Sequence, residues 1–350
     1  MRWLLGAAVV VLTGSLAWQP PAAGDDHIPS DLVTPEIRRS ADRGLEWLAA
    51  HQNENGSWTC RIGYKLNEEY RADRENDHVC ITALAGMAFL ASGAVPGRGK
   101  YGDVVEKTLD FVLSSVREGD GFISRYGTRM YEHAFATMFL AEIYGMSKRQ
   151  DVGEKLRGAV RCIIGSQNKE GGWRYMPTPV DADISVTVST LQALRAARNV
   201  GISVPKTVID AAVKYVKGCV NADGSFNYQI ERGITRSTFP LTACGVVALH
   251  SAGEYYDVAV KKGLRYLELY RDSLRYGEYH FMYGHYYAVQ AFYVRGGEDF
   301  EDYYKYVTRQ LLPHQQEDGH WEDDVGDAYA TAMACVIMQV PCDYLPVFQK

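Results

Sequence analysis

A short motif recurs along the chain and limits the fold more than any other feature of the sequence. The motif is Gln-x3-Gly-x-Trp, and it occurs with one spacing at Gln52–Trp58, Gln167–Trp173 and Gln315–Trp321. Each copy follows an amphipathic stretch and precedes a more apolar one, which predicts a repeating unit of two helices joined by a glycine turn. Weaker copies end in Gly121-Phe122 and in Gly224-Ser225-Phe226.

The spacing of the closing aromatic residues predicts a sixth unit. The closing residues are Trp58, Phe122, Trp173, Phe226 and Trp321. Successive closing residues are separated by 64, 51, 53 and 95 positions. The last interval is close to twice the others, so a degenerate copy is expected between Phe226 and Trp321. The segment Lys262–Leu267 repeats the start of the first unit, and Tyr276 lies near the expected closing position.

The two helices of each unit differ in polarity. The first carries an apolar stripe, as at Ile209, Ala212 and Val216, whereas the second is apolar nearly all round, as in 81–90 and 328–340. A helix without a polar face is expected to be buried. The sequence therefore predicts an all-α protein, an α/α toroid of about six helix pairs whose inner ring surrounds a central cavity. Glycines 93, 145, 201 and 253 are expected to end inner helices with positive φ.

The N-terminus has the pattern of a secretory signal. Arg2 precedes an apolar run over 3–12 and a small-x-small site, with cleavage expected after Ala17 and Ala23 as the alternative. No later segment reaches transmembrane length. The predicted organisation is a signal peptide at 1–17, a linker at 18–35, the toroid at 36–340 and a C-terminal tail at 341–350. We expect an exported protein, periplasmic or secreted, without an integral membrane segment.

Charge and motifs argue against several classes of partner. The formal net charge of -6 gives no electrostatic reason to bind nucleic acid. No P-loop, dinucleotide fingerprint, nucleophile elbow or HExxH motif is present, and His133 and His285 fall about half a ring apart, so neither a metal nor a cofactor is expected. The seven cysteines are expected to be mostly buried thiols, and a Cys60–Cys80 disulfide is left open.

The stretch from Arg43 to Trp58 reads Arg/Lys-Gly-x2-aromatic-Leu-x3-Gln-x3-Gly-x-Trp and resembles the QW repeat of squalene and oxidosqualene cyclases, which protein prenyltransferase β subunits share in weaker form. The resemblance covers about 36–340. It implies the toroid fold and a cavity for an apolar or isoprenoid-like small-molecule ligand. It also implies that the Gln and the Trp hold helix pairs together, a structural role.

The catalytic signatures of these relatives are absent from the sequence. The nearest match to the DxDD motif of the cyclases is Asp181-Ala182-Asp183-Ile184, which lacks the fourth acidic residue. The zinc-binding Asp-x-Cys of the prenyltransferases and the Cys-Gly-Glu-Gln of thioester domains do not occur. The resemblance therefore implies a fold and leaves cyclase or transferase chemistry unproven.

Candidate site residues lie at the expected first turns of the inner helices, which converge at one mouth of a toroid. The set comprises Asp77, His78, Glu132, His133, Asp181, Asp183, Thr238, Tyr283, His285 and Asp327. The acidic members would form an arc that binds a cation or a polyhydroxyl ligand, with Asp183, supported by Asp181, as the candidate general acid. The alternative is that acidic and hydroxyl side chains at these positions cap helix N-termini.

Two other features bear on function. The fifth unit concentrates aromatic residues that would suit a polyene or a sugar ring or simply fill the core, namely Tyr276, Tyr279, Phe281, Tyr283, Tyr286, Tyr287, Phe292 and Tyr293. The charged insertion over 59–76 is either a lid or surface elaboration.

Three functions remain, and they differ in what occupies the centre. An apolar cavity with one buried acid favours a cyclase-like or transferase-like protein. A filled centre favours a non-catalytic binding or scaffold module. An open polar groove with two or more exposed acids favours an exported carbohydrate-active lyase or hydrolase.

Overall fold

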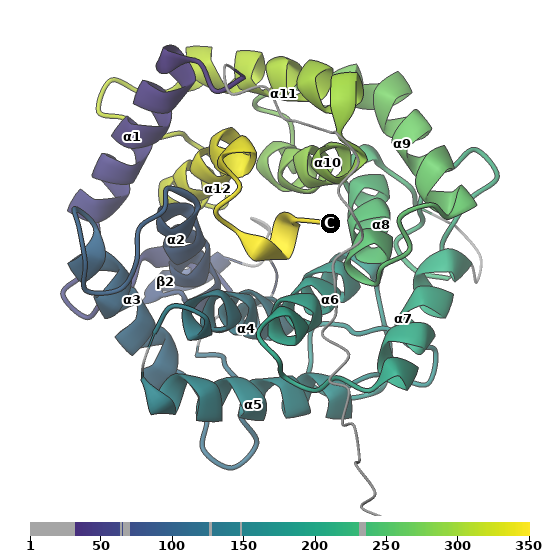
Figure 1. Cartoon of the computed structure of the whole chain (residues 1–350), viewed down its shortest axis with the longest axis horizontal. Helices are drawn as coiled ribbons and strands as arrows, with labels where there is room; N and C mark the ends of the chain where they lie inside the picture. The colour runs from purple at the N-terminus through teal and green to yellow at the C-terminus, as the bar shows by residue number, and fades with distance from the viewer. Residues whose placement is uncertain (1–31, 64, 66–70, 126–127, 148, 231–235) are drawn as a thin grey trace, which may run out of the picture.

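The computed structural model describes residues 32–350 except 64, 66–70, 126–127, 148 and 231–235, so the expected signal peptide and most of the expected linker lie outside the described residues. Within that part, twelve α-helices alternate between two concentric rings (Figure 1). The outer helices are α1 (Pro35–Ala50), α3 (Gly102–Ser114), α5 (Gln150–Gly165), α7 (Lys206–Gly218), α9 (Val258–Tyr270) and α11 (Gly297–Leu311). The inner helices are α2 (Val79–Ala91), α4 (Met130–Tyr144), α6 (Ile184–Asn199), α8 (Phe239–Ser251), α10 (Phe281–Arg295) and α12 (Asp327–Gln339).

The inner helices form a closed ring. Each contacts the next in chain order, and α12 returns to contact both α2 and α1. All residues of α2 and α8 are buried, as their apolar composition predicts, while the outer helices bury one face. The predicted α/α toroid is confirmed.

The Trp of the repeated motif joins the two helices of its own unit, and the Gln reaches the next unit. Trp173 Nε1 donates to the carbonyl of Ile163 over 2.8 Å, and Thr187 of the following inner helix accepts from the Trp173 backbone N–H. Trp58 and Trp321 make the same pair of bonds. Gln167 Nε2 donates both to Gly171 O in its own turn and to Val208 O of the next outer helix, at 2.8 Å each. Both side chains therefore have a structural role, the Trp within a unit and the Gln between units.

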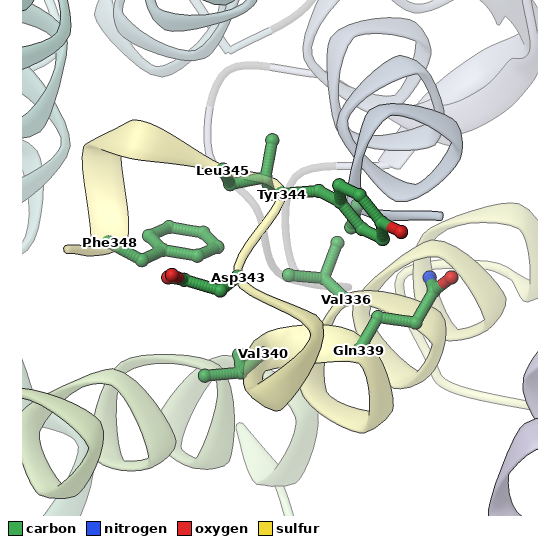
Figure 2. A pocket seen from close by; sticks show the side chains of 8 residues that line it. Val336, Gln339, Val340, Asp343, Tyr344, Leu345 and Phe348 are labelled. Atoms are coloured by element: carbon green, nitrogen blue, oxygen red, sulfur yellow. The ribbon is translucent and has the colours of Figure 1, made fainter. Parts of the chain in front are cut away.

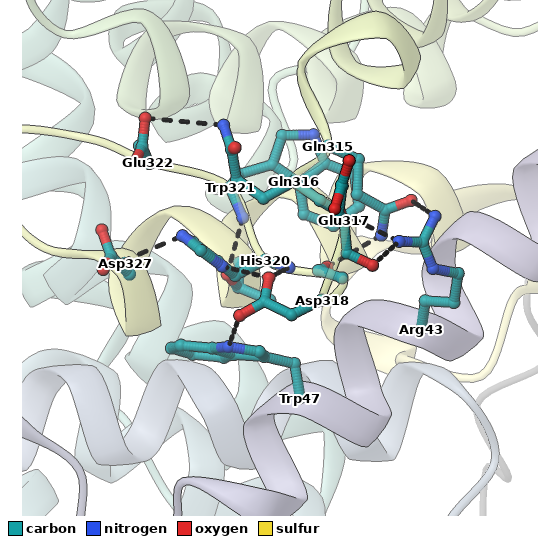
Figure 3. Close-up of polar contacts among 12 residues, drawn as sticks. Arg43, Trp47, Gln315, Gln316, Glu317, Asp318, His320, Trp321, Glu322 and Asp327 are labelled. Carbon is teal, nitrogen blue, oxygen red and sulfur yellow. Dashed lines mark hydrogen bonds and ion pairs between the residues drawn. The ribbon is translucent and has the colours of Figure 1, made fainter.

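The ring closes where the last turn meets the first helix (Figure 3). Gln315 Nε2 donates to the carbonyl of Ser40 in α1 at 2.9 Å, and Ser40 Oγ donates back to Gln315 Oε1 at 2.8 Å. Trp47 Nε1 donates to Asp318 Oδ2 at 3.0 Å. Gly319 has a φ of +110°, and a Cβ there would lie 2.7 Å from the Arg43 carbonyl, so this close approach requires glycine.

The charged insertion within the first unit, between α1 and α2, contains a two-stranded antiparallel sheet. Strands β1 (Thr59–Ile62) and β2 (Arg71–Asp77) pair with an irregularity between Cys60 and Ile62. Arg71 Nη2 donates to Asp324 O at 3.2 Å, and Cys60 Sγ lies 3.0 Å from Val325 O. The hairpin thus contacts the segment that leads into α12.

The structure corrects one prediction about the helix-ending glycines and answers whether Cys60 and Cys80 form a disulfide. Glycines 93, 201 and 253 have positive φ, but Gly145 has φ −68° at the end of α4, so that prediction was wrong for one of the four. The chain continues after Gly145 into Met146 and Ser147, whose N–H groups bond to Ile143 O, and this turn needs no left-handed residue. All seven cysteines are free thiols, including Cys60 and Cys80.

The chain ends inside the ring. After α12 and a short 3-10 turn at Val340–Cys342, Asp343 adopts a left-handed conformation with φ 61°. Residues 343–350, called the tail below, then run to the centre of the inner ring, where Figure 1 shows the C-terminus. Leu345, Val347 and Phe348 are buried there.

Candidate functional site

Several residues predicted for the site act as helix caps at the mouth of the toroid. Thr238 and Asp183 accept from backbone N–H groups in the first turns of α8 and α6, and His78 does so for α2. Each therefore satisfies an N–H that would otherwise lack a partner. The capping alternative of the sequence analysis holds for these three positions.

Asp183 is fully buried and surrounded by donors. Its Oδ1 accepts from the Val186 N–H at 2.9 Å and from Ser185 Oγ at 2.6 Å. Its Oδ2 accepts from the Tyr228 hydroxyl at 3.0 Å and lies 3.5 Å from Arg174 Nε. Burial raises the pKa of the Asp183 carboxyl, and these donors oppose the rise. Both oxygens are thus held by protein groups.

Asp181 lies beside this cluster but in solvent. Its carboxylate is half exposed and pairs with Arg174 Nη1. The same guanidinium therefore contacts Asp181 and Asp183, and its positive charge offsets both acids. A surface pair of this kind contributes little to stability, whereas the buried Asp183 depends on the cation.

His133 and His285 make buried connections in two of the three units that lack the motif's tryptophan. His133 Nδ1 accepts from the Ile123 N–H at 3.0 Å, and its Nε2 lies 3.1 Å from Ala159 O in α5. His285 lies 2.7 Å from the Tyr303 hydroxyl and 3.0 Å from Leu274 O. Burial lowers the pKa of both imidazoles to about 4, so they are neutral connections between inner and outer helices.

Asp77 and Glu132 have local partners of their own. Asp77 accepts from the Asn55 side-chain amide at 2.8 Å and so fixes the first glycine turn. Glu132 is buried, accepts from Ser124 Oγ, and has no partner for Oε1. Burial raises the pKa of Glu132 to about 7.

The raised pKa of Glu132 predicts how stability depends on pH. The folded chain retains a proton that the unfolded chain releases near its ordinary value of 4.5, so stability falls as pH rises from there through about 7. Glu132→Gln removes this dependence and is expected to reduce the loss in unfolding free energy between pH 5 and pH 8 by roughly 3 kcal/mol. Urea titrations of both chains at the two pH values measure it. Equal losses in the two chains would show that Glu132 is ionised when folded.

A polar pocket opens at the mouth between the fifth and sixth units. Its volume is about 350 Å³, and its lining, called the acidic pocket below, consists of residues 276–282, 322–325, Asp327 and Tyr329. Five of these side chains are carboxylates: Glu278, Glu322, Asp323, Asp324 and Asp327. Asp327 is the one member of the predicted arc that lines it. Of the other acids of the arc, Asp77 and Asp183 accept from a turn and a helix N-terminus, Asp181 pairs with Arg174, and Glu132 is buried beside Ser124.

Several ionisable groups of the acidic pocket have shifted pKa values, and those of Asp323 and His280 bear most on its chemistry. Asp323 is largely buried, and burial raises its pKa to about 6, with the charge of Asp324 adding to the rise. Its Oδ1 accepts from the Val325 N–H at 2.9 Å. Burial lowers the pKa of His280 to about 4, and this residue has a left-handed backbone with φ 69°. At neutral pH the pocket therefore offers a neutral imidazole and a carboxyl group that exchanges protons readily.

Aromatic rings complete the acidic pocket. Tyr279 is 44% exposed, and its ring centroid lies 3.8 Å from that of His280. Tyr276 stacks on His314 at 4.0 Å and donates to Glu322 O at 3.1 Å, so it holds the edge of the pocket to the last turn. Part of the aromatic cluster of the fifth unit thus faces solvent beside the acids.

The rest of that cluster fills the centre. The rings of Phe135 and Tyr286 are 6.2 Å apart, although α4 and α10 lie on opposite sides of the inner ring. Gln192 Nε2 donates to Gln290 Oε1 across the same space, and the Tyr283 hydroxyl donates to Ser185 O at 3.2 Å. Phe135, Tyr286 and Tyr287 expose 0–1% of their surface, so the ring is packed at their level.

Sequence reasoning missed the acids and the histidine of the pocket. Glu322, Asp323 and Asp324 follow the last Trp directly, between the turn and α12, and so lie outside the first turns that were searched. The run of three acids in that position was the available signal. Among the described residues, no group of three or more His, Cys, Asp or Glu is arranged to hold a metal ion. None of the described helices combines the length and apolar character of a bilayer span.

Comparisons with known proteins find similarity in structure and not in sequence. No protein-family model and no curated protein matches the chain. Cellobiose 2-epimerase from Spirochaeta thermophila has a TM-score of 0.65 at 13% identity, covering 89% of this chain and 98% of the epimerase. A type II terpene cyclase from Scytonema, solved with the product merosterolic acid A, has a TM-score of 0.61 at 12% identity, covering 91% and 100%.

A third similar structure is a protein from Actinoplanes, with a TM-score of 0.59 at 13% identity, covering 88% of this chain and 99% of that one. Identities this low establish the fold and leave the activity open. The chain therefore has the α/α toroid fold shared by type II terpene cyclases and cellobiose 2-epimerases.

Proposed function

We propose that this protein is an exported carbohydrate-active protein that binds a sugar in the acidic pocket. The observation that carries the proposal is the open 350 Å³ space in which exposed carboxylates lie beside an exposed tyrosine ring. Sugar hydroxyls donate hydrogen bonds to carboxylates, and the faces of sugar rings stack on aromatic side chains. The pocket volume falls in the range of roughly 300–1,000 Å³ that small-molecule sites occupy.

Asp323 is the group in this pocket best suited to move a proton. Its pKa of about 6 allows both protonation states near neutral pH, which a general acid or base requires. Glu322, Asp324 and Asp327 lie in the same lining and provide candidate second carboxylates. Glycosidic and epimerisation chemistry both need proton transfer at a sugar carbon or oxygen, so the pocket is compatible with either.

An apolar, isoprenoid-like ligand in the central cavity is the second candidate. A terpene cyclase of this fold has been solved with geranylgeranyl dihydroxybenzoate, which supports it by analogy. The packed rings of Phe135, Tyr286 and Tyr287 leave such a ligand no room at their level of the ring. The sugar-binding function is therefore preferred.

The test is to titrate the purified chain with a panel of oligosaccharides that includes cellobiose, and to analyse the products by chromatography. Asp323→Asn is expected to lower turnover about 100-fold or more while affinity stays within a few-fold, because the amide keeps the hydrogen bonds but does not transfer a proton. Asp302→Asn, at an exposed site on α11, is the matched control and should behave as the wild-type chain.

Each result separates the candidate functions. Binding without turnover would indicate a sugar-binding module. Turnover of a prenyl substrate without binding of any sugar would overturn the proposal in favour of the apolar ligand. Export is tested separately by sequencing the N-terminus of the mature protein, which is expected to start after Ala17 or Ala23.

A further inference from the structure

The tail occupies the end of the ring opposite the mouth. Its short 3-10 turn, Pro346–Phe348, contacts α4, α6 and α10. Leu345, Val347 and Phe348 are 3–5% exposed, and the Phe348 ring lies 6.1 Å from that of Tyr286. Apart from the buried Glu142, which contacts the backbone of Val347, this end of the ring is therefore apolar, with the packed centre as its floor, and the tail fills it.

The tail fits this end closely, and the space left beside it has no room for a water molecule. Figure 2 shows a narrow crevice between the tail and α12, with Tyr344, Leu345 and Phe348 on one side and Val336 and Gln339 on the other. Tyr344 points its ring outward and is 55% exposed. The tail thus has an apolar, buried part and an exposed part, and the two can be changed independently.

A cation on α6 holds the tail through neutral atoms. Arg195 donates to His250 O at 2.9 Å, to the Tyr255 hydroxyl at 2.8 Å, and to the carbonyl of Gln349. Asn199, one turn further along α6, donates to Pro346 O at 3.4 Å. The Arg195 Nε is buried and has no hydrogen-bond partner.

A guanidinium in this setting favours an anionic partner. Charge-assisted hydrogen bonds from arginine to a carboxylate are about twice as strong as those to a neutral carbonyl, and they form in pairs through the two ends of the guanidinium. The Gln349 carbonyl accepts a hydrogen bond from one end of the Arg195 guanidinium and carries no charge. A carboxylate attached to an apolar chain would satisfy the cation and the apolar walls together.

We propose that this end of the toroid is a binding site for an apolar carboxylic acid, and that the tail is an intramolecular occupant which such a ligand displaces. The hydrocarbon part would take the place of Leu345, Val347 and Phe348. The carboxylate would take the place of the Gln349 carbonyl at Arg195. The site lies at the opposite end of the ring from the acidic pocket and does not depend on the proposed sugar-binding function.

The test compares dodecanoate with the uncharged dodecan-1-ol by calorimetric titration of the full-length chain. Phe348→Ala removes a buried ring of the occupant and is expected to raise dodecanoate affinity at least about tenfold. Tyr344→Ala is the matched control on the exposed part of the same segment and should bind as the wild-type chain does. Adding Arg195→Gln to Phe348→Ala should abolish the preference for dodecanoate over dodecan-1-ol.

Two results would overturn the proposal. One is equal dodecanoate affinity in Phe348→Ala and the wild-type chain. The other is a Phe348→Ala chain that binds dodecan-1-ol as tightly as dodecanoate. If Phe348→Ala fails to fold, as judged by thermal unfolding, Asn199→Ala loosens the tail from the α6 side, and an unchanged dodecanoate affinity in that variant overturns the proposal equally.

Discussion

Trp321→Ala is expected to lower the free energy of unfolding by about 3–5 kcal/mol, because the substitution leaves a large cavity at the junction of the first and last units. The indole is fully buried and donates to Leu311 O at 2.9 Å. Its ring packs so closely on α1 that a Cβ at Gly44 would lie 3.0 Å from it. Urea unfolding followed by circular dichroism measures the change, and hydrogen exchange in α1 should rise more than in α6.

Trp47 provides the control at the same junction. It lies on α1, is partly exposed, and donates to Asp318 at 3.0 Å. Trp47→Ala removes one exposed hydrogen bond and is expected to cost about 1 kcal/mol. A loss as large as that of Trp321→Ala would show that the exposed contacts, and not the buried indole, hold the ring closed.

Asp183→Ala is also expected to destabilise the chain by about 3–5 kcal/mol, because it removes a buried carboxylate that accepts from Val186, Ser185 and Tyr228 and that faces Arg174. Asp181→Ala is the matched variant, since Asp181 pairs with the same Arg174 but is half exposed. It should cost less than about 1 kcal/mol. Thermal and urea unfolding of the two variants measure the difference.

The same pair of variants tests whether Asp183 has a catalytic role. Asp183→Asn keeps the shape of the side chain and, with its amide oxygen in the place of Oδ1, the acceptor for Val186 and Ser185, while its amide nitrogen faces Tyr228. If this variant is stable and retains turnover on any substrate found, Asp183 is structural. A stable Asp183→Asn chain without turnover would show that the buried acid takes part in the chemistry.

The fold could be predicted from the sequence because its determinants are local and repeated. Gln167, Gly171 and Trp173 act within one turn and on the next helix, and the same distances recur at the other two copies of the motif. The three units without the tryptophan were harder to interpret, because two of them use a buried histidine of the inner helix, His133 or His285, to make their connections.

The site was predicted less well, since its position depends on contacts between distant segments. The arc of acids was deduced from position in the repeat, but Asp77, Asp181 and Asp183 have partners that no spacing reveals. The acidic pocket is formed by the segments before α10 and α12, which are about 45 residues apart in the chain. Burial of the tail depends on the width of the ring, which the pattern of a single unit does not encode.

The closure of the ring also determines when the protein becomes stable during its synthesis. The bond between Ser40 and Gln315 joins residues 275 positions apart. Until the last unit has been made, the face of α1 that Trp321 covers has no partner. The tail, which fills the end of the ring opposite the mouth, has also not yet been made. A nascent chain therefore accumulates helix pairs one by one but gains its final cooperativity late, when loop closure brings its two ends together.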